Sequence, residues 1–186
     1  MKWIKRYIPK IILLDTLLYS VLFLVLCSLL KAFNLMFRQW VGYTSAAVIV
    51  LGVIAGIVQL IWICRKNKSK ILPLVLLFLI LAVVSPVAYF MGMLTYKPEY
   101  EVEMDGKSYI AYVNTFFRTR VEYYDAVNGM VAGNQIRIKE DYGGGSFDPI
   151  GNPTGYAHKI EETIYYDENG NVARTIYYDK NGNAIE

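Results

Sequence analysis

The sequence predicts an α+β membrane protein in which three transmembrane helices are followed by a small antiparallel β-sheet domain. Three long apolar runs lie within residues 1–96, and at Lys97 the composition changes to polar, tyrosine-rich segments with the alternation of strands. The charge divides at the same point. Residues 1–96 carry ten basic residues and one acid, a net +9, whereas residues 97–186 carry nine basic residues and fifteen acids, a net −6. We therefore expect a membrane module over residues 1–96 and a β domain over residues 97–186.

The predicted spans cover residues 11–30, 44–64 and 71–95. At about 1.5 Å per residue, each is long enough to cross a hydrocarbon core of about 30 Å. The first run follows a basic segment, as in a signal peptide, but no cleavage site of small residues comes after it, so we expect an uncleaved helix. Trp40 and Tyr43 precede the second run, where aromatic side chains meet lipid headgroups.

The distribution of basic residues predicts the orientation of the spans. Four precede the first run and four lie in the connection 65–70, whereas the connection 31–43 holds two. Because cytoplasmic loops carry an excess of Lys and Arg, the N-terminus is expected in the cytoplasm. With three spans, residues 97–186 are then extracytoplasmic, and the protein is a multi-pass protein of the cell membrane.

The predicted spans contain a few residues of special interest. Asp15 is their one charged residue, and Gln59 lies at a similar depth in the second span, so we expect these two to face each other in the bundle, directly or through one water. Gly52 and Gly56 form a G-x-x-x-G pattern that allows another helix to approach closely. Pro86 lies inside the third span and predicts a kink there.

The β domain begins with a predicted hairpin. Asp105-Gly106 is a typical two-residue turn, and closing it pairs Val102 with Tyr109 and Tyr100 with Ala111, which matches the apolar faces of the two strands.

Two further strands are predicted from alternation. One covers residues 116–125, with Phe117, Val121 and Tyr123 on its apolar side, and the other covers residues 135–139. Residues 142–156 are rich in Gly and Pro and are expected to form a loop.

The end of the chain contains an internal repeat. Ile164–Asn171 recurs twelve residues later as Ile176–Asn183, and each copy is a strand ending in an Asn-Gly turn. The pair predicts a hairpin repeat over residues 164–186, whose second strand begins near Val172. The repeated Tyr-Tyr-Asp-x-Asn-Gly-Asn resembles the tyrosine-aspartate repeats of bacterial surface proteins and the MORN-like repeats of some antitoxin-type proteins. The whole chain resembles small multi-pass membrane proteins of Gram-positive bacteria with a β-rich extracytoplasmic tail, which implies a place in the bacterial envelope.

No catalytic or metal-binding constellation is evident in the sequence. Asp167, Asn169 and Asn171 have the spacing of the first calcium-loop ligands, but Val172 and Tyr178 stand where such a loop needs Gly and an acid. We therefore expect no metal, no cofactor and no enzymatic activity. The eleven tyrosines of residues 97–186 suit either a sheet face or stacking on sugars.

These features favour a non-enzymatic, membrane-anchored extracytoplasmic binding or interaction protein of a bacterial envelope, with an immunity, sensing or accessory role. The alternative is a small accessory subunit of a membrane transporter that uses Asp15 and the Pro86 kink. The expected partners are the lipid bilayer and a protein or peptide outside the cell, and a homo-oligomer is left open. Nucleic acid is not expected, because the basic residues flank apolar runs.

Overall fold

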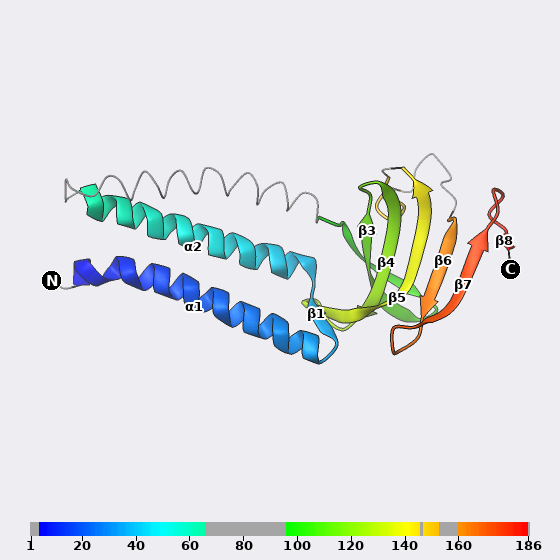
Figure 1. Ribbon diagram of the computed structural model, residues 1–186, viewed down its shortest axis with the longest axis horizontal. Helices are drawn as coiled ribbons and strands as arrows, with labels where there is room; N and C mark the ends of the chain where they lie inside the picture. The colour runs from blue at the N-terminus through cyan, green and yellow to red at the C-terminus, as the bar shows by residue number, and fades with distance from the viewer. Residues whose placement is uncertain (1–3, 66–95, 146, 153–159, 186) are drawn as a thin grey trace. The chain divides into compact units, whose positions relative to one another are not determined.

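The computed structural model describes residues 4–65, 96–145, 147–152 and 160–185 (Figure 1). The third predicted span, residues 71–95, and the predicted kink at Pro86 lie outside the described residues. The described part has two helices and an antiparallel sheet, which confirms the predicted α+β class and two of the three predicted helices.

The chain forms two compact units. The first comprises Met1–Leu29 and Gln39–Met93, and the second comprises Leu30–Arg38 and Leu94–Glu186. The sequence placed the boundary near residue 96 and did not predict that the segment Leu30–Arg38, between the first two apolar runs, would group with the β domain.

The helical unit contains α1 (Ile4–Ala32) and α2 (Gln39–Arg65). Within them, Leu14–Ala32 and Gln39–Gly56 are long and apolar enough to cross a membrane. None of the residues of Leu14–Ala32 is buried, although most are apolar. Helix α1 is therefore unlike the core helix of a water-soluble domain, whose apolar face is covered by protein.

Helices α1 and α2 contact each other at small and polar side chains. Gly52 of α2 lies directly against Thr16 of α1, so that a Cβ at position 52 would collide with the threonine hydroxyl. The Tyr19 hydroxyl of α1 donates a hydrogen bond to Oγ of the buried Ser45, at 3.2 Å. Gly56, one turn beyond Gly52, is also buried. The missing side chain at Gly52 is thus what allows the two backbones to approach at this point.

The second unit is built on an eight-stranded antiparallel sheet (Figure 1). Its strands are β1 (Leu35–Phe37), β2 (Glu99–Met104), β3 (Lys107–Asn114), β4 (Arg118–Ala126), β5 (Val131–Gly144), β6 (Glu162–Tyr166), β7 (Val172–Tyr178) and β8 (Ala184–Ile185). Strands β2 to β8 follow one another in chain order, and β1 pairs with β5.

Strand β1 comes from the connection between the two helices. Asn34 has a left-handed backbone (φ 55°), which Asn adopts more readily than most residues, and this conformation turns the chain out of α1. Met36 then pairs with Ala132 at the start of β5. Ala132 also pairs with Ala126 of β4, so β1 occupies the opposite edge of β5. Strand β6 lies further along that same edge, opposite residues 138–141.

The predicted hairpin at Asp105-Gly106 is confirmed. Val102 pairs with Tyr109 and Tyr100 with Ala111, and the turn residues Asp105 and Gly106 have positive φ angles of 51° and 72°.

The predicted C-terminal hairpin is confirmed as well. Strands β6 and β7 pair, and β7 begins at Val172, where the repeat predicted it.

Two details of the predicted strands are wrong. Phe117 is 81% exposed, because the Asn114 side chain accepts a hydrogen bond from the N–H of Phe116 and turns the chain, so that β4 begins only at Arg118. The buried residue at this end of β4 is Thr119. Strand β5 is also much longer than the predicted 135–139, since it pairs with three strands along its length.

Both faces of the sheet bury side chains. One face carries a cluster of Ala111, Val113, Val121 and Tyr123, and the other a cluster of Ile110, Tyr112 and Ala132. Met36 of β1 packs against the second cluster. The connection between the helices therefore supplies part of the β-domain core.

An ion pair reinforces the attachment of this connection. Arg38 Nε donates to Glu99 Oε1 at 2.5 Å, and Nη1 donates to Glu101 Oε2 at 3.2 Å. The side chains of Arg38 and Glu99 are each only 13% exposed, whereas that of Glu101 is 62% exposed. The N–H of Arg38 also donates to the Met130 carbonyl at 2.9 Å. Arg38 thus joins the segment after β1 to both β2 and the β4–β5 turn.

We predict that Arg38→Met destabilises the β domain by about 2 kcal/mol, because it removes the guanidinium that pairs with the largely buried carboxylate of Glu99. The control Glu101→Gln removes only the exposed partner and is expected to cost less than about 1 kcal/mol. Urea unfolding of the full chain in detergent micelles, followed by near-ultraviolet circular dichroism of the tyrosines, measures both. Equal losses would contradict a special role for the Arg38–Glu99 pair.

Candidate binding site on the β domain

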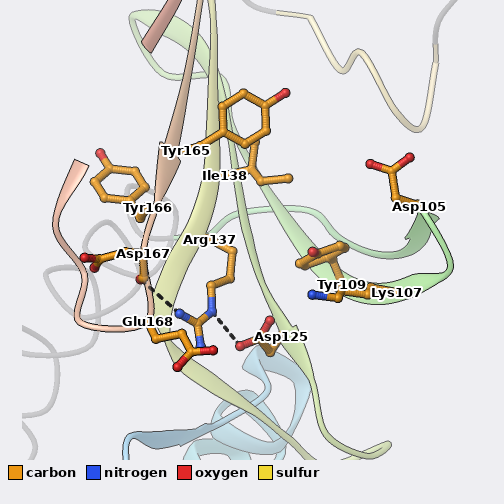
Figure 2. A pocket seen from close by; sticks show the side chains of 10 residues that line it. All are labelled: Asp105, Lys107, Tyr109, Asp125, Arg137, Ile138, Tyr165, Tyr166, Asp167 and Glu168. Carbon is orange, nitrogen blue, oxygen red and sulfur yellow. Dashed lines mark hydrogen bonds and ion pairs between the residues drawn. The ribbon is translucent and has the colours of Figure 1, made fainter. Parts of the chain in front are cut away.

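A cavity of about 450 Å³ lies on the β domain (Figure 2). It is lined by charged side chains and tyrosines from the β2–β3 hairpin, from β4 and β5, and from β6 with the turn that follows it. The lining residues are Asp105, Lys107, Tyr109, Asp125, Arg137, Ile138, Tyr165, Tyr166, Asp167 and Glu168. A cavity of this size suits a small ligand or a single large side chain.

The strand register brings these residues together. Tyr109 of β3 is directly opposite Asp125 of β4, and Ile138 of β5 is directly opposite Tyr165 of β6. Residues that are opposite in an antiparallel pair share a face of the sheet. Tyr109 and Ile138 also pack against the cluster around Tyr123, so the cavity adjoins the apolar core on that face.

An irregularity in the pairing of β4 with β5 sets the direction of the Arg137 side chain. Tyr123 pairs with Ile138 but Tyr124 pairs with Ile136, so Arg137 is the extra residue of a β-bulge. Its Nε donates to Asp125 Oδ2 at 2.6 Å, and its Nη1 donates to the backbone carbonyl of Asp167 at 3.0 Å. Figure 2 shows the guanidinium between these two partners. The side chain therefore ties β4 to the β6–β7 turn across β5.

The β6–β7 turn is organised by the Asp167 carboxylate. Its Oδ1 accepts the N–H groups of Asn169 and Asn171 at 2.9 and 2.8 Å, and Gly170 supplies the left-handed conformation with φ 81°. The N–H and side-chain amide of Asn171, followed by the N–H of Asn169, hold the pKa of the Asp167 carboxyl below its usual range. This turn is fully explained by local hydrogen bonds.

The second copy of the repeat forms the same turn. Asp179 Oδ1 accepts the N–H groups of Asn181 and Asn183 at 2.7 and 2.8 Å, and Gly182 has φ 80°. The calcium-loop spacing noted in the sequence is therefore used for turn hydrogen bonds in both copies. Among the described residues, no group of three or more His, Cys, Asp or Glu side chains is placed to hold a metal ion.

Three charged groups of the cavity remain available after these contacts. Within the described part of the chain, the side chains of Asp105, Lys107 and Glu168 make no hydrogen bond or ion pair, and all three residues are exposed. Tyr165 is half-buried, and its pKa is raised mainly by burial and further by nearby Tyr178 and Glu140. The tyrosine therefore stays neutral and keeps its hydroxyl as a donor or acceptor at neutral pH.

Other tyrosines on the same face are engaged within the sheet. The hydroxyls of Tyr123 and Tyr142 both donate to Glu140 Oε2, at 2.7 and 2.9 Å. Burial and the Glu140 charge raise the pKa of both tyrosines. These residues fill the core, in line with the sheet-face interpretation, whereas Tyr109, Tyr165 and Tyr166 line the cavity.

The residues singled out in the apolar runs lie elsewhere, on the helical unit. Asp15 is exposed, and the side-chain oxygen of Gln59 is buried with no hydrogen-bond partner in the described structure. No hydrogen bond joins Asp15 to Gln59 among the described residues, and their pairing stays a prediction.

Sequence reasoning did not find the cavity. The sequence predicts Asp105 in a turn, Tyr109 on the apolar face of the first hairpin and Arg137 within the strand 135–139, and none of these predictions indicates that the three side chains share a cavity. The sequence signal that was present is the Asp-x-Asn-Gly-Asn turn, which marks one wall but does not show what lies opposite.

No protein-family model matches the chain, and no curated protein sequence does. Two solved structures have a partial structural likeness: TarM, and a point mutant of S. aureus TarM in complex with Fondaparinux, alpha-GlcNAc-glycerol and UDP. Each is 15% identical, with a TM-score of 0.21, and the match covers 53% of this chain and 20% of the TarM chain. At this TM-score the likeness carries no argument about fold or function.

We predict that Asp167→Ala accelerates amide hydrogen exchange at Asn169 and Asn171, because both N–H groups lose their acceptor. The matched variant Asp179→Ala should do the same at Asn181 and Asn183 and leave the first turn unchanged. Nuclear magnetic resonance of the full chain in micelles measures both. Exchange that rises equally in both turns for either variant would show that the turns are not independent.

We also predict that the Asp167 carboxyl titrates below the usual Asp value of about 3.9. Because its folded pKa is lowered, its support of the turn is complete above the unfolded pKa and is lost as the pH falls through the folded pKa. The carboxyl ¹³C shift of Asp167 reports the midpoint, and a midpoint at or above the usual value would contradict the hydrogen-bonded turn.

Proposed function

We propose that the chain is a membrane-anchored binding protein of a bacterial envelope, whose β domain is extracytoplasmic and recognises a protein or peptide without catalysing a reaction. The observation that carries this proposal is the pairing of β1 with β5. Because β1 lies between α1 and α2 in the chain, the connection between the helices and residues 97–186 belong to one folded unit.

This pairing has a topological consequence if α1 and α2 cross a membrane. Residues on one sheet lie on one side of the bilayer, so Leu35–Phe37 and Glu99–Met104 share a side. Helix α2 begins on that side at Gln39 and ends at Arg65 on the other side. The chain then has to cross once more before β2, and residues 71–95 are the apolar run available for that crossing.

A shared side for β1 and the β domain also supports a common side for the two basic segments. The N-terminal segment and the connection 65–70, with four basic residues each, lie on the side opposite the β domain. This agrees with the positive-inside rule, which was applied without reference to the sheet. The pairing of β1 with β5 thus supports a β domain on the side opposite the two basic segments, and the positive-inside rule supports that side being extracytoplasmic.

The cavity supports a binding role rather than a catalytic one. Arg137 and Asp125 neutralise each other, and the Asp167 carboxylate is occupied by turn N–H groups. Such contacts hold side chains in place and leave no activated nucleophile paired with a base among the described lining residues. A cavity with a fixed frame, tyrosine walls and a few available charges is suited to recognition.

We expect Lys31→Cys and Lys180→Cys, each in a background in which Cys27 and Cys64 are replaced by serine, to react with a membrane-impermeant maleimide on spheroplasts. Ser69→Cys should react only after permeabilisation, because it lies in the basic connection. Opposite labelling of Lys31→Cys and Lys180→Cys would contradict a shared side for β1 and the β domain. Labelling of Ser69→Cys alone would reverse the orientation.

A further inference from the structure

We propose that the cavity between the β2–β3 hairpin and the β6–β7 turn binds the cationic side chain of a basic peptide, a lysine ammonium or an arginine guanidinium. This inference rests on the proposed function: the β domain is taken to recognise a protein or peptide, and the inference specifies which side chain of that ligand enters the cavity. It is carried by the size of the cavity, its remaining charge, its tyrosine walls and the charge of the domain around it.

The charge of the cavity is negative once the internal contacts are considered. Its lining contains four carboxylates and two basic side chains. The Arg137 charge is compensated by Asp125 at 2.6 Å. The remaining charged groups of the lining are the basic Lys107 and three acidic groups, namely Asp105, Glu168 and the charged carboxylate of Asp167. A cation entering the cavity therefore meets a net attraction, whereas an anion does not.

Arg137 is poorly placed to reverse this preference. Its Nε and Nη1 are directed at Asp125 and at the Asp167 carbonyl, and its side chain is 24% exposed. A guanidinium held in this way acts as part of the frame and orients the Asp125 carboxylate. Its removal would release that carboxylate, which is why Arg137 is unsuitable as a test position for ligand contact.

The tyrosines supply the second part of a cation site. Tyr165 and Tyr166 come from β6, and Tyr109 comes from β3 with Asp105 and Lys107 beside it, so aromatic rings stand on two walls (Figure 2). A cation within about 6 Å of a ring centre is attracted by the negative face of the ring. Ile138 lies between these walls and provides apolar contact for the methylene stem of a lysine or arginine.

The surrounding domain favours the approach of a basic ligand. Residues 97–186 carry a net charge of −6. A field of this sign raises the local concentration of cations and the rate of their association. The exposed Asp105 and Glu168 belong to the two turns at the rim, so they are placed to meet the ligand first.

The test measures the affinity of the full chain, in phosphatidylcholine nanodiscs, for the probe penta-lysine. Penta-lysine is titrated into the protein and binding is followed by calorimetry. The site variant combines Asp105→Asn with Glu168→Gln. The matched control combines Glu103→Gln with Glu162→Gln, which removes the same charge from β2 and β6 but outside the cavity lining. We expect the site variant to weaken penta-lysine binding about tenfold and the control less than about threefold.

A second pair of variants tests the aromatic walls. Tyr166→Leu keeps an apolar side chain in the cavity but removes the ring, and Tyr177→Leu changes an exposed tyrosine outside the cavity lining. Loss of one cation–π contact is expected to weaken penta-lysine binding about threefold for Tyr166→Leu and not for Tyr177→Leu. Unchanged near-ultraviolet circular dichroism, apart from the lost ring, shows that each variant is folded.

Three outcomes would overturn the proposal. The first is that penta-lysine does not bind the unaltered chain. The second is that the site and control double variants lose affinity equally, which would indicate only the general field of the domain. The third is that penta-lysine does not bind while chitotriose binds in a manner lost in Tyr166→Leu, which would indicate a sugar site. Because binding is measured on purified protein, it is independent of the labelling that tests the orientation.

Discussion

The short strand β1 is the contact that makes the connection between the helices part of the β domain. Three residues between the two apolar helices pair with the start of β5, and Arg38 follows them with a largely buried ion pair to Glu99. Three residues of strand contribute little alone, but Met36 also packs against the buried cluster around Ile110. The helix connection and the β domain therefore belong to one compact unit.

Strand β5 is the second organising element. It pairs with β4 on one edge, and with β1 and then β6 on the other, so its fourteen residues hold together parts of the chain that are distant in sequence. The bulge at Arg137 lies between the segments paired with β1 and β6. A regular strand would direct this side chain to the opposite face. The bulge instead places it between Asp125 and the β6–β7 turn, and the frame of the cavity results.

The repeated turns show how one local motif serves two purposes. Both copies use an aspartate to accept two backbone N–H groups, and both use a glycine with positive φ. The second copy connects β7 to the short β8, whereas the first also offers its Asp167 carbonyl to Arg137. The two turns have the same hydrogen bonds, but only the first contributes to the cavity lining. The difference therefore comes from the position of the first turn in the sheet and not from its sequence.

The sequence by itself determined the features that depend on neighbouring residues. Asp105-Gly106 specified its hairpin and register because only a few backbone angles close a two-residue turn, and the Asn-Gly repeats specified the last hairpin in the same way. Apolar length specified the helices. Only the tertiary structure decided the pairing of β1 with β5, the bulge at Arg137 and the exposure of Phe117. The first two depend on strand partners that are distant in the sequence. The exposure of Phe117 depends on the Asn114 side chain, which takes the N–H of Phe116 as its hydrogen-bond donor in place of strand pairing. The alternation of polar and apolar residues along a strand does not indicate any of the three.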